Sequence, residues 1–158
     1  METKLKEKTE KIIGQLNDLV EINNDRIQGY ERAISETDDE DLTYLFTNMA
    51  AHSRSYKSDL SKEVTSLGGE PTSGTKNSGK LFRAWMDIKA ALTGKNRKEI
   101  LASCEFGENA ALDTYKTILA DEDHVLTENL HKLILMQKQE IQLDHDRVKA
   151  LKELGKNL

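Results

Sequence analysis

Apolar residues recur every three or four positions along four long stretches of this chain, a spacing that predicts amphipathic helices. The stretches cover about residues 3–35, 42–67, 97–120 and 125–154. Acidic turns at 37–41 and 121–123 separate the first pair and the last pair, and Gly68-Gly69 followed by Pro71 ends the second stretch. The many charged and few aromatic residues suit long solvent-facing helices better than a sheet, whose strands favour β-branched and aromatic residues. The pattern therefore predicts an all-α protein.

The connections between these helices differ in length, and this difference predicts the topology. Short links join the first helix to the second and the third to the fourth, so each pair is expected to form an antiparallel hairpin. The middle link, 69–96, is much longer and contains an apolar stretch with Phe82, Trp85 and Met86 that predicts a short helix over about 80–92. A helix of about 26 residues spans roughly 39 Å. The link is long enough to cover that distance, which would make the second and third helices parallel; a link that stays at one end is the alternative.

Two of the predicted helices carry the same polar pattern on their apolar stripe. Asn23 precedes Tyr30 by seven residues, and Glu108 precedes Tyr115 by seven. Seven residues are two helical turns, so both members of each pair face the same way. A buried amide or carboxylate destabilises a fold unless it is hydrogen-bonded or bound. The repeat therefore predicts a polar site at the centre of two similar hairpins.

Composition limits the classes of function. Of the 158 residues 32% are charged, 5% are aromatic, and the net charge is −5. A nucleic-acid or anionic-membrane surface needs a basic patch, which this sequence lacks, so neither partner is expected. The N-terminal residues are charged rather than apolar, which does not resemble a signal peptide. Cys104 is the only cysteine, so a reducing cytoplasm is the expected compartment for a single domain over 1–158.

At several places the sequence resembles the ferritin-like superfamily, and within it a family of small bacterial four-helix-bundle proteins of unknown function. The resemblance covers about residues 12–152. It rests on segments 23–26, 29–30, 67–71, 80–87, 93–94 and 104–108. It implies a ferritin-like four-helix bundle in which the long crossover carries the short extra helix.

The superfamily's di-iron centre takes a glutamate from each of two helices and a Glu-x-x-His from each of the other two. This sequence keeps Glu108 but has Asn23 in the first helix. In the second helix Ser53 and Tyr56 stand where glutamate and histidine are expected. The string Glu128-x-x-His131 lies too near the start of the fourth helix to reach Glu108, and we interpret it as coincidence.

The register of the fourth helix stays open at the sequence level. One register brings Glu140 and Leu143 to the centre, and another brings Gln142 and His145. The candidate metal ligands are accordingly Asn23, Tyr56, Glu108, Glu140 and His145, with iron or manganese as the metal. No catalytic or cofactor-binding residue is identified.

Two main hypotheses follow. The first is a non-enzymatic ferritin-like bundle with a degenerate di-metal site, stress-associated by resemblance, which acts through an unknown protein partner or as a homodimer. Its central Glu108 would be held by Tyr30 or Asn23, and Glu108→Leu would raise thermal stability because a buried ionisable group is costly. The second is a divergent metal-binding or di-iron oxidoreductase or iron-handling protein that uses Glu108 and Glu140. A bundle that opens to bind lipid or a small molecule is a third hypothesis. Cys104 is expected in the core, and His52 and His124 at the surface.

Overall fold

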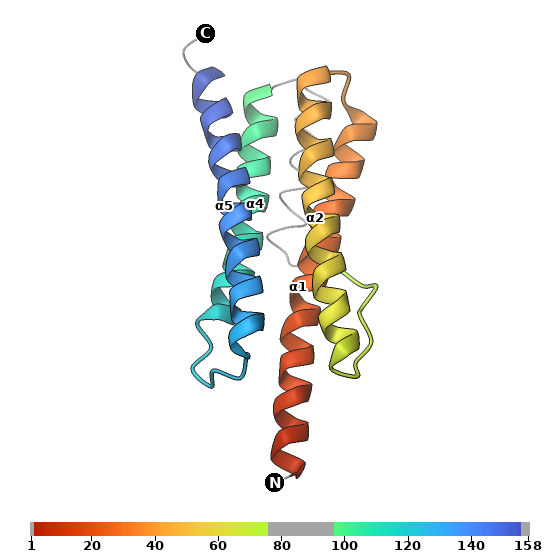
Figure 1. Ribbon diagram of the computed structural model, residues 1–158. Helices are drawn as coiled ribbons and strands as arrows, with labels where there is room; N and C mark the ends of the chain where they lie inside the picture. The colour runs from red at the N-terminus through yellow and green to blue at the C-terminus, as the bar shows by residue number, and fades with distance from the viewer. Residues whose placement is uncertain (1, 76–96, 156–158) are drawn as a thin grey trace.

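The computed structural model describes residues 2–75 and 97–155, which form four helices and no strand (Figure 1). The helices are α1 (Glu2–Glu36), α2 (Glu40–Ser66), α4 (Arg97–Leu119) and α5 (Glu128–Gly155). The prediction of an all-α bundle is confirmed. The short helix expected over 80–92 lies outside the described residues. None of the described helices is long and apolar enough to span a membrane.

Contacts at the helix ends define how the two hairpins are arranged. Arg97 at the start of α4 forms an ion pair with Asp39, which caps the start of α2, at 3.0 Å. At the opposite end, Lys11 and Gln15 of α1 hydrogen-bond to Asp121, just after α4. The starts of α2 and α4 therefore lie at the same end of the bundle, and these two helices run in the same direction. The end of α2 and the start of α4 therefore lie at opposite ends of the bundle.

Local chemistry explains where the helices begin and end. The Asp39 carboxylate accepts hydrogen bonds from the backbone amides of Asp41 and Leu42, which have no partner inside the helix. Gly68 follows α2 with a φ of 86°, and the Gly69 amide donates to the Val64 carbonyl. This is a Schellman motif, and the positive φ favours glycine.

Helix α5 begins at Glu128, three residues later than predicted. Thr127 caps it, because its hydroxyl accepts a hydrogen bond from the Leu130 amide at 3.2 Å. Val125 is buried in the core but lies in the loop before the helix. The apolar pattern counted Val125 as helical because burial alone does not distinguish a helix from an ordered loop.

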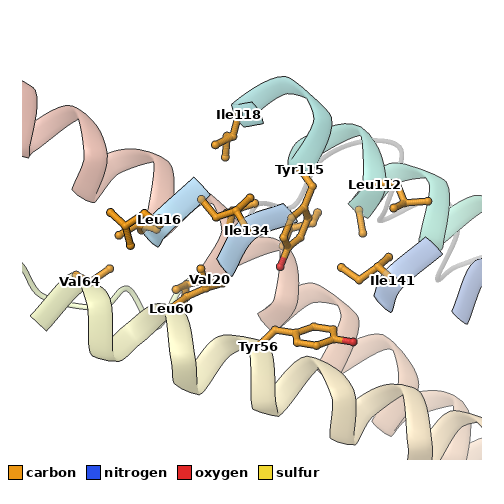
Figure 2. Packing of buried hydrophobic residues seen from close by; sticks show 14 of the residues in the cluster. Leu16, Val20, Tyr56, Leu60, Val64, Leu112, Tyr115, Ile118, Ile134 and Ile141 are labelled. Atoms are coloured by element: carbon orange, nitrogen blue, oxygen red, sulfur yellow. The ribbon is translucent and has the colours of Figure 1, made fainter. Parts of the chain in front are cut away.

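The core consists of two apolar clusters separated by polar residues. Figure 2 shows part of the first cluster, in which Leu16 and Val20 of α1, Leu60 and Val64 of α2 and Ile134 of α5 lie close together. The second cluster lies nearer the α1–α2 turn and contains residues such as Phe46, Met49 and Cys104. Between them the buried polar side chains are those of Asn23, Arg26, Ser53, Glu108, Gln137 and Asp144.

Two asparagines of α1 hold the first part of the long link. The Asn17 side chain donates to the Glu70 carbonyl at 3.1 Å and accepts from the Thr72 amide at 3.0 Å. Two turns further along, Asn24 donates to the Gly74 carbonyl at 2.8 Å. Residues 70–74 therefore lie along α1, and the link leaves α2 in the direction of the other end of the bundle.

Candidate functional site

The centre of the bundle is a buried ion pair between Arg26 of α1 and Glu108 of α4. One terminal nitrogen of Arg26, Nη2, donates to both carboxylate oxygens of Glu108, at 2.7 and 2.9 Å, and Nε donates to Oε1 at 3.3 Å. The two residues are 0% and 1% exposed. Charge-assisted contacts of this kind are among the strongest hydrogen bonds in proteins. The pair links the two hairpins, since each partner comes from a different one.

Neighbouring side chains complete the hydrogen bonding of this pair. The other terminal nitrogen of Arg26, Nη1, donates to the hydroxyl oxygen of Ser53 on α2 at 2.6 Å. The Tyr30 hydroxyl donates to Glu108 Oε1 at 2.5 Å, and its ring centroid lies 5.9 Å from the guanidinium carbon. These hydrogen bonds allow the two charges to remain in the core, because they replace the water that each ion loses on burial.

A second carboxylate connects the pair to the surface. Asp144 of α5 is 3% exposed, and its Oδ2 lies 3.7 Å from Arg26 Nη2. The same oxygen lies 2.8 Å from His52 Nδ1 on α2, and the His52 side chain is 41% exposed. We call Arg26, Tyr30, Ser53, Glu108 and Asp144 the central cluster. All four described helices contribute to it.

The surroundings of the cluster shift the pKa of Arg26, of Tyr30 and of the neighbouring Cys104. Burial alone would lower the pKa of Arg26, but the nearby Glu108 carboxylate, Tyr30 and Asp144 raise it above its ordinary value. Burial and Glu108 both raise the pKa of Tyr30 and that of the Cys104 thiol well above their ordinary values. Cys104 is therefore a core residue rather than a nucleophile, because only the thiolate is reactive.

A second polar group lies about one turn before Arg26 on α1, at Asn23. Asn23 Nδ2 donates to the Tyr115 hydroxyl of α4 at 2.9 Å, and this hydroxyl donates to Gln137 Oε1 of α5 at 2.7 Å. Gln137 Nε2 in turn donates to the Tyr56 carbonyl of α2 at 3.3 Å. The side-chain amide oxygen of Asn23, Oδ1, is buried and accepts no hydrogen bond from the described residues.

The sequence repeat of Asn23 with Tyr30 and Glu108 with Tyr115 has a simple structural meaning. Each polar residue bonds to the tyrosine of the other helix, so Asn23 contacts Tyr115 and Glu108 contacts Tyr30. Because α1 and α4 are antiparallel, the two seven-residue spacings match, and both contacts form in a single register. Of the two partners predicted for Glu108, Tyr30 is the one that contacts it.

The remaining ligand candidates lie away from the Glu108 carboxylate. The Tyr56 side chain is buried and lies near Glu140, which is exposed. His145 faces the other side of α5, where its Nε2 lies 3.6 Å from Glu105 Oε1. In the actual register of α5, the inward side chains are those of Gln137, Ile141 and Asp144.

The other histidines lie at the surface or close to it. His124 and His131 are exposed, and His52 is partly exposed and bonded to Asp144. Glu128 is exposed as well and forms an ion pair with Lys132.

Sequence reasoning missed Arg26, the residue around which the cluster is built. The apolar pattern placed Ile27 on the inward stripe, whereas Arg26 is fully buried and Ile27 only partly. Charged residues are rarely buried, so the pattern favoured the isoleucine. The available signal was the spacing: Arg26 lies three residues after Asn23 and four before Tyr30, on the same helical face.

The donor set does not fit a di-metal centre. Such a centre needs about four carboxylates, whereas the central cluster has Glu108 and Asp144, both facing the Arg26 guanidinium. The guanidinium is permanently charged and would repel a metal ion at the same place. Among the described residues, no group of three or more His, Cys, Asp or Glu side chains is arranged to hold a metal ion.

Fold and site together define a four-helix bundle with a buried ion pair at its centre. The family model described as Domain of unknown function (DUF2383) matches residues 11–121. The chain belongs to this family. The matched region contains Arg26, Tyr30, Ser53 and Glu108 but ends before α5. A search of curated proteins gave no significant match.

Proposed function

We propose that this protein is a non-enzymatic, ferritin-like bundle in which an arginine–glutamate pair stands where related bundles hold two metal ions. It acts by associating with a protein partner or with a second copy of itself. The observation that supports the proposal is the contact of Arg26 with both oxygens of the buried Glu108 carboxylate. The all-helical fold and the parallel α2 and α4 fit a ferritin-like arrangement.

The charge balance of the centre supports this reading. Arg26 contributes one positive charge, and Glu108 and Asp144 contribute two negative charges. A divalent or trivalent ion would need these carboxylates as ligands and would have to separate them from the guanidinium. The guanidinium cannot become neutral to make room, since it stays protonated in proteins. The centre therefore favours helix packing over metal binding.

The alternative is an iron-handling protein that uses Glu108 and Glu140. These two carboxylates lie in different surroundings, because Glu108 is 1% exposed whereas Glu140 is exposed and lies near Tyr56. They do not form one site in this arrangement. The stress-associated role implied by the resemblance, and the cytoplasm as compartment, belong to the proposal as expectations.

Metal analysis separates the two functions. Protein is purified from iron- or manganese-supplemented cells without affinity metal columns, and its metal content is measured for the unmodified protein, Glu108→Gln and Glu140→Gln. We expect far less than one ion per chain in all three. Near-stoichiometric metal that is lost in Glu108→Gln but kept in a surface control, Glu10→Gln, would overturn the proposal and favour the iron-handling alternative.

A further inference from the structure

Helix α5 carries two rows of apolar residues on opposite sides. The inward row is Ile134, Ile141 and Val148, each 0% exposed and each seven residues apart. An outward row is shifted by two positions and consists of Met136, Leu143 and Ala150, with Leu154 one turn further. A shift of two residues is a rotation of about 200° around a helix, so this row faces away from the core.

The outward row is open in the part of the chain that the structure describes. Met136 is 48% exposed, Leu143 67% and Leu154 61%, and Ala150 is exposed as well. Figure 1 shows α5 at the outer edge of the bundle, with α4 as its close neighbour. Isolated exposed apolar residues are common, but a row at heptad spacing on one helix is typical of a helix that packs against another helix.

The charges beside this row are arranged so that the helix is complementary to itself. Glu140 precedes Leu143 by three residues, and Arg147 follows it by four, both on the flank of α5 nearer α2. In an antiparallel pair of identical helices, the same flanks face each other. With the two-fold axis beside Leu143, Arg147 lies opposite Glu140 of the partner subunit, and symmetry forms this pair twice. In the same register Met136 faces Ala150 of the partner subunit, a large side chain against a small one.

The described contacts of the long link do not place it on the outward row of α5. Its described start is held on α1 by Asn17 and Asn24, and its described end places Arg97 beside Asp39 at the start of α2. Both ends therefore lie against the α1–α2 hairpin, whereas the outward row lies on α5. Arg147 is exposed and forms no ion pair with the described residues, so it is available to a second molecule.

We infer that the outward face of α5 is a self-association surface, on which a second copy of this chain binds antiparallel through Leu143 and two Glu140–Arg147 ion pairs. The inference deepens the proposed function, since it identifies one partner as the protein itself. One helix face is smaller than the roughly 800 Å² per partner of a standard stable interface. The dimer is therefore reversible and depends on protein concentration.

Sedimentation velocity across a range of concentrations, together with a charge-swap series, tests this surface. Arg147→Glu or Glu140→Arg alone places like charges opposite each other and should weaken the dimer about tenfold or more. The double variant Glu140→Arg/Arg147→Glu recreates both ion pairs and should return to within about threefold of the original dissociation constant. Leu143→Glu should abolish the dimer. Lys149→Glu makes the same charge change as Arg147→Glu away from the row and should have little effect.

Far-UV circular dichroism shows that each variant is folded, which is expected because the changed side chains are exposed. A protein that is monomeric at every concentration overturns the inference. So does a dimer that Leu143→Glu leaves intact, or one that the single reversals weaken and the double variant fails to restore. A dimer that forms through another face would contradict the inference about α5 but would still agree with the proposed self-association. Bound metal would contradict the proposed function but would not bear on the inference about α5.

Discussion

Substitution of Glu108 tests whether the central ion pair is a structural element. Without the carboxylate, the fully buried Arg26 keeps Ser53 at 2.6 Å and has Asp144 at 3.7 Å as its nearest remaining negative charge. Removal of one partner of a buried pair typically destabilises a protein by about 3–5 kcal/mol. We therefore expect Glu108→Leu to lower the free energy of unfolding by about 3–5 kcal/mol, or the melting temperature by roughly 10 °C. This reverses the expectation from sequence alone that Glu108→Leu would stabilise the protein, because that expectation did not include Arg26.

The double variant Arg26→Met/Glu108→Leu makes the test independent of whether the single variant folds well. It removes both charges and fills the space with apolar side chains, which is often neutral or stabilising by about 1–4 kcal/mol. Arg26→Met alone should be destabilising, since it leaves the Glu108 carboxylate buried with Tyr30 as its remaining donor. The losses in free energy of unfolding of the two single variants, added together, should thus exceed the loss in the double variant by about 3 kcal/mol or more.

Urea unfolding followed by far-UV circular dichroism measures these differences, provided that the slope with denaturant stays the same among variants. Glu10→Leu is a matched control, because Glu10 is exposed on α1, and it should change stability by less than about 0.5 kcal/mol. A loss of less than about 1 kcal/mol in the free energy of unfolding of Glu108→Leu would contradict this prediction. So would a double variant whose loss in the free energy of unfolding equals the sum of the losses of the two single variants.

Two further predictions concern other contacts. Burial raises the pKa of Tyr30, Tyr56 and Tyr115 above 10.0, so the unfolded chain releases protons more readily and stability should fall above pH 10 by about 4 kcal/mol per pH unit. In a Tyr44→Phe background that removes the exposed tyrosine, phenolate absorbance should appear only as the fold is lost; absorbance from folded protein would contradict this. Asn17→Ala removes two contacts to the link and should cost about 1–2 kcal/mol. Limited proteolysis should then cleave within 70–75 faster than in the unmodified protein, and an unchanged rate would show that Asn17 does not hold the link.

The helices and their order could be predicted from the sequence because they depend on local periodicity. The four apolar stripes gave the helix positions to within three residues, and the length of the middle link predicted that α2 and α4 are parallel. The repeat of Asn23 with Tyr30 and Glu108 with Tyr115 correctly indicated a polar centre. Which residue contacts which could not be predicted, because it depends on the register between α1 and α4, and spacing within one helix does not define a register between two.

Arg26 could not be predicted for a different reason. Burial of a charge depends on whether an opposite charge lies within reach, and Glu108 lies 82 residues away in the sequence. A hydrophobicity pattern evaluates each residue alone, so it favours Ile27 as the inward side chain. The same limit applies to α5, where the choice between Glu140 and Ile141 depends on how the helix is rotated against α2 and α4.

The identity of the central cation determines what the bundle can do. A metal ion can dissociate, exchange and change its oxidation state, whereas the Arg26 guanidinium is covalently attached and has a constant charge. In the proposed function, the role of the centre is therefore geometric. The contacts of Tyr30 with Glu108 and of Asn23 with Tyr115 form in one register, and a slip of α4 by one turn, about 5.4 Å, would break both together and leave Arg26 without Glu108. Buried polar contacts of this kind can specify one arrangement of helices among several that bury similar apolar area. We therefore expect the centre to select the alignment of the two hairpins, and in the proposed function this alignment would set how the helix faces are presented to a partner.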